Sequence, residues 1–163
     1  MNVTIQSSFN APSPECIEKH PAAVLFECME ERFGQTCTQL TVKRNTIICN
    51  QGARLSSLYL IRRGEISLTR LSPDGRETLI SILGPGDFFG EGSLLSGTAV
   101  TFSASTTKSS VLLQLPDRKF KEMLEEPHNC RILLEAIARR CDDAWTQLEV
   151  LGCAHVRDKV RSG

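Results

Sequence analysis

Between Cys37 and Leu115 the sequence is divided into short segments of alternating apolar and polar residues, separated by turn residues at regular spacing. A period of two is typical of β-strands with one buried face, and glycine-rich corners let such strands follow one another closely. Seven segments carry the pattern, over residues 37–42, 46–49, 57–61, 65–71, 77–83, 101–106 and 111–115. The pattern predicts a mainly β fold with flanking helices, in which the strands form a double-sheet jelly roll. Hairpin corners are expected at Arg63-Gly64 and Asp74-Gly75.

One stretch of this region, from Leu83 to Gly97, holds five glycines and one proline, and its only charged residues are Asp87 and Glu91. Glycines let backbone N–H groups approach a ligand closely, and a helical turn after Gly92 would add N–H groups that attract an anion. A carboxylate such as that of Glu91 accepts hydrogen bonds from a sugar hydroxyl. The stretch is therefore a candidate site for a small nucleotide, although a turn and a β-bulge also account for its glycines.

The residues before the β region have a different character. Residues 1–14 are mostly small and polar, so we expect a flexible N-terminal arm. From Pro21 to Gly34 apolar residues recur at helical spacing, with proline suited to the first turn and glycine to the end. Residues 15–126 are accordingly assigned to one domain of an N-terminal helix and a β-roll, closed by a short helix at Asp117–Leu124.

After Glu126 the sequence becomes helical again and contains its longest periodic run. Apolar or small residues alternate steps of four and three, which is the pattern of a seam in a two-stranded coiled coil. The seam consists of Cys130, Leu134, Ile137, Cys141, Ala144, Leu148 and Leu151. A seam with no partner inside its own domain finds one on a second copy, so residues 127–155 are predicted to be a long homodimerisation helix. The alternative is a helix packed on its own β-roll.

Composition narrows the possible partners. The chain has 163 residues, which is enough for one domain with a substantial core. Its 19 basic and 19 acidic residues balance, so no general attraction to nucleic acid or to an anionic membrane is indicated. No apolar run approaches the roughly 20 residues that cross a bilayer, and a signal-peptide pattern is absent. These features predict a cytoplasmic protein.

The seven cysteines include no C-x-x-C pair, so neither a disulfide framework nor a zinc ribbon is expected. Burial as small apolar residues accounts for most of them, and no metal is expected. Cys141 is the exception, because a seam position would bring two copies face to face, and a thiol or redox sensor is retained as an alternative function. No histidine lies within the β region and no nucleophile has an evident base, so the chain is not expected to be an enzyme.

Several motifs resemble, in their order, the effector domain of the Crp/Fnr family of bacterial transcription regulators, over residues 26–156. They are Asn50-Gln51-Gly52, the run from Ser57 to Ile66, Gly86-Asp87-Phe88-Phe89-Gly90-Glu91 and Ile137-Ala138-Arg139-Arg140. The resemblance implies a cyclic-nucleotide-binding jelly roll in which a small effector shifts the paired long helices. That shift would reorient helix-turn-helix domains that read DNA. These domains are expected after Gly163, with residues 156–163 as the start of the linker.

In family members that bind cyclic AMP, the position of Gly90 supplies a backbone N–H and that of Glu91 accepts a ribose hydroxyl. The resemblance implies ligand contacts at Gly90, Glu91, Gly92, Ser93, Leu94, Thr101, Phe102, Ser103, Arg140, Ala144 and Trp145. Thr101 stands where the family has an arginine for the cyclic phosphate, and Ala144-Trp145 where it has Thr-Ser for the adenine. Losing a charge-assisted bidentate pair weakens the case for cyclic AMP, so the effector is left open between a cyclic nucleotide and another small molecule.

The alternative from a different class is a regulatory nucleotide-binding module of a kinase or a channel, where the same roll controls an enzyme or a pore. The residues after Gly163 would separate the two hypotheses. A helix-turn-helix sequence there supports a transcription regulator, whereas a kinase glycine loop supports the alternative.

Overall fold

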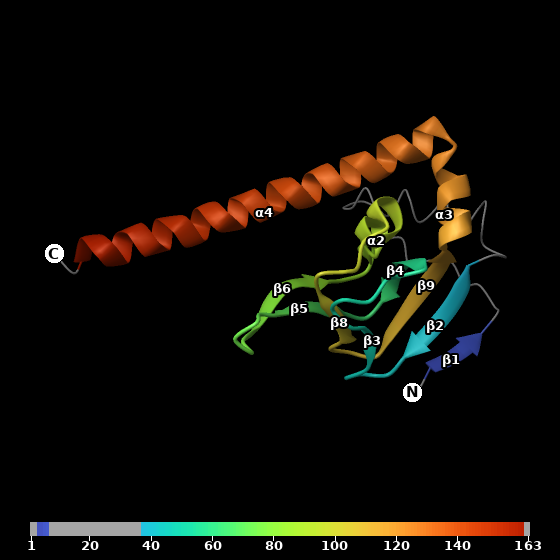
Figure 1. Ribbon diagram of the computed structural model, residues 1–163, viewed down its shortest axis with the longest axis horizontal. Coiled ribbons are helices and arrows are strands. Elements are labelled where there is room, and N and C mark those ends of the chain that lie inside the picture. Colours follow the sequence, from blue (N-terminus) through green and yellow to red (C-terminus); the bar gives the residue numbers. More distant parts are fainter. Residues whose placement is uncertain (1–2, 7–36, 162–163) are drawn as a thin grey trace.

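The computed structural model describes residues 3–6 and 37–161, with side chains described for residues 37–148. The helix expected over residues 21–34 lies outside the described residues. The strands are β1 (Val3–Gln6), β2 (Thr38–Val42), β3 (Ile47–Cys49), β4 (Ser57–Arg63), β5 (Ile66–Leu71), β6 (Glu77–Leu83), β7 (Phe88–Phe89), β8 (Ser103–Thr106) and β9 (Ser110–Pro116). They form two antiparallel sheets, of order β1-β2-β9-β4-β7 and β3-β8-β5-β6, which confirms the predicted mainly β roll (Figure 1).

Two segments differ from the sequence-based expectation. Val3–Gln6, inside the stretch expected to be a flexible arm, forms β1 and pairs with β2 along its whole length. Its β-branched residues suit an edge strand. Gly64, expected at a hairpin corner, instead carries the chain from β4 in one sheet to β5 in the other. Its φ is +96°, and a Cβ there would overlap Ser110, so only glycine fits this crossing.

Three helices flank the described strands: α2 (Glu91–Ser96), α3 (Asp117–Leu124) and α4 (Pro127–Arg161). In Figure 1 α4 runs past α2 and the roll, and its C-terminal end projects beyond the sheets. Asp117 begins α3 directly after β9, and its backbone N–H donates to the carbonyl of Ser56 at 2.8 Å. Among the described helices, none is long and apolar enough to cross a membrane.

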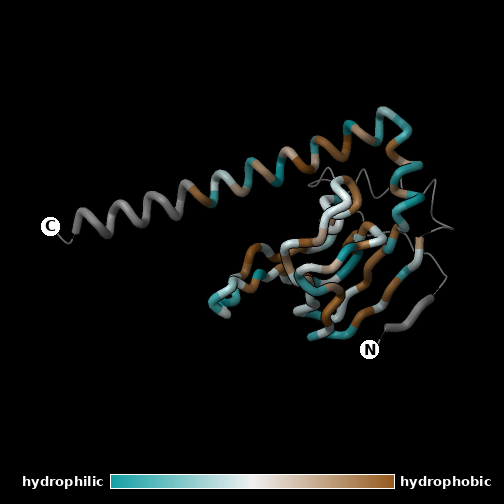
Figure 2. The backbone as a smooth tube through the Cα atoms, in the orientation of Figure 1, coloured by the Kyte–Doolittle hydropathy of each residue, from teal (hydrophilic) through white to brown (hydrophobic). Residues whose placement is uncertain are grey.

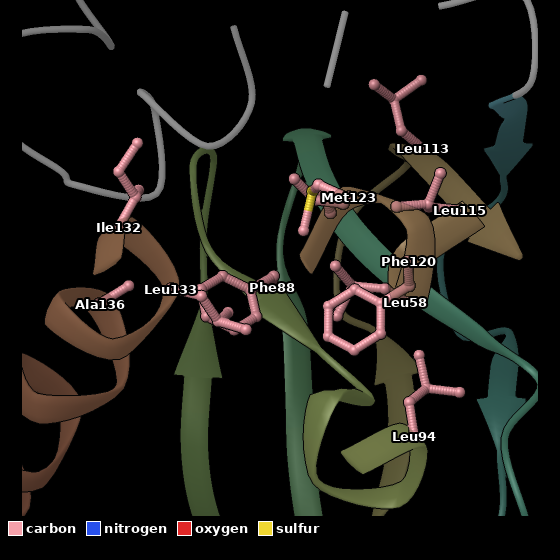
Figure 3. Packing of buried hydrophobic residues seen from close by; sticks show 11 residues of the cluster. Leu58, Phe88, Leu94, Leu113, Leu115, Phe120, Met123, Ile132, Leu133 and Ala136 are labelled. Carbon is pink, nitrogen blue, oxygen red and sulfur yellow. The ribbon is translucent and has the colours of Figure 1, made fainter. Parts of the chain in front are cut away.

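The core has two parts that share the larger sheet. One lies between the sheets and is filled by Val42, Ile61, Ile66, Leu68, Leu83, Phe89, Val100, Ala104 and Leu112, with Cys49 buried among them. The other lies under the helices, where Phe88, Leu58 and Phe120 meet Met123 and the first turns of α4 (Figure 3). Burying one such side chain contributes roughly 1.5–3 kcal/mol, so these contacts are the main force holding α4 to the roll.

The two faces of α4 differ in what they contact. Ile132, Leu133 and Ala136 are buried against the roll, and Figure 3 shows Leu133 beside Phe88. Of the predicted seam, Cys130 and Ile137 are partly buried, while Leu134, Cys141, Ala144 and Leu148 are exposed. Leu151 lies outside the residues whose side chains are described. Apolar and polar residues alternate along the described part of α4 (Figure 2), so an apolar stripe continues where the helix has left the roll.

Candidate ligand-binding site

The glycine-rich stretch is fixed to the larger sheet by its first turn. The backbone N–H groups of Gly86 and Ile61 donate to the carbonyls of Ile61 and Asp87, respectively, each at 2.9 Å. The Asp87 carboxylate accepts from the N–H of Gly84 at 2.9 Å and so closes the turn on itself. Asp87 therefore has a structural role, and Glu91 is the carboxylate of the stretch that remains for a ligand.

Gly90 sets the direction in which the chain leaves this turn. It caps α2 in the left-handed conformation, with φ +100°, and the cap has no side-chain hydrogen bond. A Cβ at this position would lie 2.9 Å from the carbonyl oxygen of Ser57, so the backbone approaches β4 as closely as glycine allows. The first N–H groups of a helix have no partner inside it. They lie here beside Glu91, the first residue of α2.

A pocket of about 210 Å³ opens at this point. It is lined by Gly90, Glu91, Gly92, Ser93, Ser96, Thr98, Ala99, Val100, Thr101 and Phe102. Ser93 ties the two sides of the pocket together, since its hydroxyl donates to the carbonyl of Thr98 at 2.6 Å and accepts from the N–H of Leu55 at 3.2 Å. One wall is aromatic, where Phe102 packs edge-on against Phe89 with ring centroids 6.4 Å apart.

Glu91 is partnered by a residue of the long helix. The Arg140 Nη1 lies 3.1 Å from the Glu91 Oε1 and also donates to the carbonyl of Phe88 at 3.0 Å. Its guanidinium lies over the Phe88 ring, 5.0 Å from the centroid. The Glu91 side chain is only 20% exposed. Burial raises the pKa of the Glu91 carboxyl, and the nearby Arg140 charge lowers it by a smaller amount.

Six of the residues implied by the family resemblance line this pocket: Gly90, Glu91, Gly92, Ser93, Thr101 and Phe102. Arg140 joins them through Glu91. Leu94 does not line the pocket, because its side chain is buried in the core under the helices. Ser103 lies in β8 and accepts a hydrogen bond from the N–H of Gln51. Ala144 and Trp145 are exposed on α4.

The lining is completed by four residues that were not predicted from the sequence: Ser96, Thr98, Ala99 and Val100. Ser96 belongs to the glycine-rich stretch and the other three lie between its end and Thr101, so continuity along the chain was the one signal that could have found them. Val100 is buried, and hydrogen bonds between its backbone and residues 52–53 hold this segment in place.

The described cysteines, Cys37, Cys49, Cys130 and Cys141, are all free thiols. Burial raises the pKa of the Cys49 thiol, which makes it less reactive, whereas Cys141 is exposed on α4. No group of three or more His, Cys, Asp or Glu side chains is placed to hold a metal ion in the described part of the chain.

Comparison with known proteins agrees with this geometry. Residues 39–127 match the family model of the cyclic nucleotide-binding domain. The chain is 32% identical over 114 residues to the cyclic AMP receptor protein of Thermus thermophilus, covering 68% of this chain and 51% of that protein. It is 34% identical over 98 residues to a CRP-like cAMP-activated global transcriptional regulator of Mycobacterium tuberculosis, covering 60% of this chain and 44% of that one.

Among solved structures, the catabolite activator protein of Thermus thermophilus superposes with a TM-score of 0.63 at 25% identity. That match covers 90% of this chain and 63% of the other. The chain thus spans about half the length of the curated relatives it matches.

Proposed function

Since the chain belongs to the cyclic nucleotide-binding domain family, with Crp/Fnr-type transcription regulators as homologues, we propose that it senses a small phosphorylated nucleoside and transmits binding through α4. The observation that carries this proposal is the ion pair between Glu91 in the pocket and Arg140 on α4. It makes one residue both a ligand contact and an anchor of the long helix. The named relatives are regulators, and we propose no catalytic step for this chain.

The pocket supports a sugar phosphate as the enclosed part of the ligand. Glu91 can accept hydrogen bonds from ribose hydroxyls, and the start of α2, which has no side-chain cap, offers N–H groups to an anion. A volume of about 210 Å³ is smaller than the roughly 300–1,000 Å³ of pockets that enclose a whole drug-sized ligand. The base would therefore extend from the pocket, with Phe102 on one side and the exposed Ala144 and Trp145 of α4 as further contacts.

Ligand binding would compete with the ion pair between Glu91 and Arg140, which helps to hold α4 on the roll. A ribose hydroxyl that bonds to Glu91 Oε1 uses the carboxylate oxygen that now accepts from Arg140. Arg140 can then turn toward the ligand or keep only its bonds to Phe88. Either change alters how α4 rests on the roll, and a ligand that binds one arrangement better shifts the population toward it.

The long helix supports assembly into a homodimer. Leu134 and Leu148 belong to the predicted seam, and in the single chain they are 65% and 59% exposed. Together with Cys141 and Ala144 they form the apolar stripe that a second α4 would cover. The formal net charge of this chain is zero, so it has no general attraction to the phosphates of DNA. We therefore assign DNA recognition, in a cytoplasmic regulator, to a part outside these 163 residues.

Thermal unfolding of the purified chain with cyclic AMP, cyclic GMP or adenosine tests the proposal. A ligand that binds only the folded state raises the unfolding midpoint, by an amount that grows with ligand concentration. We expect a rise with at least one cyclic nucleotide, and a much smaller rise in Glu91→Ala. No rise with any of the three compounds at millimolar concentration would contradict the proposal.

A further inference from the structure

The pocket has too little positive charge for the ligand proposed above. Glu91 is the only ionisable residue among those that line it. Arg140 lies beside that carboxylate, and its charge is already paired with it. Thr101, at the position where the family has an arginine, is exposed and uncharged. A further cation would bind a phosphate in this pocket more tightly than neutral donors do, because a charge-assisted hydrogen bond is roughly twice as strong as a neutral one.

The loop between β3 and β4 brings an arginine to the rim of the pocket. The N–H of Gly52 donates to the carbonyl of Val100 at 2.8 Å, and the N–H of Val100 donates to the carbonyl of Ala53 at 2.8 Å. Two residues further on, the N–H of Leu55 donates to the Ser93 hydroxyl at 3.2 Å. Val100 and Ser93 both line the pocket. Arg54 lies between these two attachments, so its backbone is held against the pocket on both sides.

The side chain of Arg54 is available for a ligand. It is exposed, and within the described part of the chain it takes part in no hydrogen bond or ion pair. Ala53, the residue before Arg54, is bonded to Val100, and Val100 directly precedes Thr101, so the backbone of Arg54 lies close to the position where the family has its arginine. Arginine suits this task because its planar fork binds phosphate oxygens in a bidentate manner.

We propose that Arg54 is the phosphate-binding residue of this chain and replaces, from a neighbouring loop, the arginine absent at Thr101. This inference rests on the proposed function, because it assigns a partner to the phosphate of the same ligand. With Arg54 included, the group of Glu91, Arg140 and Arg54 carries one net positive charge. The site therefore prefers an anionic nucleotide to a neutral nucleoside of the same shape.

The test compares the affinities of cyclic AMP, cyclic GMP and adenosine, measured by calorimetry, for the unaltered chain and for Arg54→Gln. Adenosine has the ribose and base of cyclic AMP but no phosphate, so it reports the rest of the site. Arg54→Gln should weaken cyclic nucleotide binding about ten- to a hundredfold and leave adenosine binding within about twofold. The difference between the two proteins should shrink as salt is raised.

Arg63→Gln is the matched control, because Arg63 is also exposed but lies at the opposite end of β4 from Gly90. It should bind each compound like the unaltered chain, and both variants should unfold at the same temperature as that chain without ligand. If the unaltered chain binds a cyclic nucleotide and Arg54→Gln binds it equally well, the role of Arg54 is overturned while the proposed function stands. If the unaltered chain binds none of the three compounds, both proposals fail.

Discussion

The guanidinium of Arg140 lies 3.1 Å from the carboxylate of Glu91, which joins the middle of the long helix to the first residue of α2. The same guanidinium bonds to the carbonyl of Phe88 and covers its ring. Below this contact, Phe88 packs in the core with Ile132, Leu133 and Ala136 of α4. A ligand that contacts Glu91 therefore acts next to the atoms that hold α4 on the roll.

Replacing Arg140 by alanine should destabilise the unliganded chain by roughly 1–2 kcal/mol. The variant loses two charge-assisted hydrogen bonds and leaves Glu91 in a buried position without its cation. The estimate is reduced because the Arg140 side chain is 33% exposed and solvent screens part of the pair. Urea unfolding measures the change. Arg139→Ala is the control, since Arg139 is exposed at the preceding position of the helix and its loss should change stability by less than about 0.5 kcal/mol.

The pH dependence of stability should change in Glu91→Gln. Burial raises the pKa of the Glu91 carboxyl above 4.5, so the folded chain keeps a proton that the unfolded chain has released at the same pH. This group therefore favours the folded state at low pH, and its contribution is lost as the pH rises through the folded pKa. The free energy of unfolding of Glu91→Gln minus that of the unaltered chain should increase from about pH 4 to pH 7. A constant or decreasing difference would show that the Arg140 charge outweighs burial.

Gly90→Ala should destabilise the fold by about 1–3 kcal/mol, because alanine is strained at φ +100° and its Cβ would press on the Ser57 carbonyl. Gly92→Ala is the matched variant in the same turn. Nothing lies within 4 Å of a Cβ there, and alanine favours the helix, so its stability should be equal or slightly higher. Thermal unfolding separates the two. Equal losses in both variants would mean that Gly90 is not held in the left-handed conformation in solution.

Leu134→Glu should shift the chain from dimer to monomer. Leu134 is 65% exposed in the single chain, so the substitution costs little folding energy, whereas two glutamates facing each other across a seam repel. Analytical ultracentrifugation at several concentrations gives the dissociation constant. Arg139→Glu, which lies on α4 outside the seam, should leave the dimer intact. A monomeric unaltered chain at high micromolar concentration would contradict the proposed pairing.

Disulfide cross-linking at Cys141 tests the register of the two α4 helices in that dimer. A seam position places the two Cys141 thiols opposite each other, and this residue is exposed in the single chain. Mild oxidation with diamide should therefore give a disulfide-linked dimer on a non-reducing gel, and Cys141→Ser should remove it. Persistence of the linked species in Cys141→Ser would assign the cross-link to another cysteine and place the seam elsewhere.

The alternating pattern and the glycine corners were enough to predict the β-roll, since the side-chain period fixes which face of a strand is buried. β7 was missed because two phenylalanines between Asp87 and Gly90 are too short a segment to show any period. The role of Gly64 could not be predicted either, because a corner within one sheet and a crossing between two sheets both use a glycine with positive φ.

For the site, Glu91 and Arg140 were implied by the family resemblance and are brought together in the structure. Leu94 follows Ser93 in sequence but points into the core, and a helical turn of six residues gives no signal for which side each residue faces. The position of Arg54 could not be read from the sequence either. It depends on the pairing of Ala53 with Val100, two segments that only the folded sheets bring together.

Two contacts from different elements hold the start of the pocket. The turn before Phe88 is bonded to the main chain of Ile61 in β4, while the carboxylate of Glu91 is bonded to the guanidinium of Arg140 on α4. At 1.5 Å per residue, the part of α4 from Arg140 to Arg161 is about 30 Å long. A tilt of α4 by about 10° about Arg140 would move its C-terminal end by about 5 Å, which is close to the rise of one helical turn.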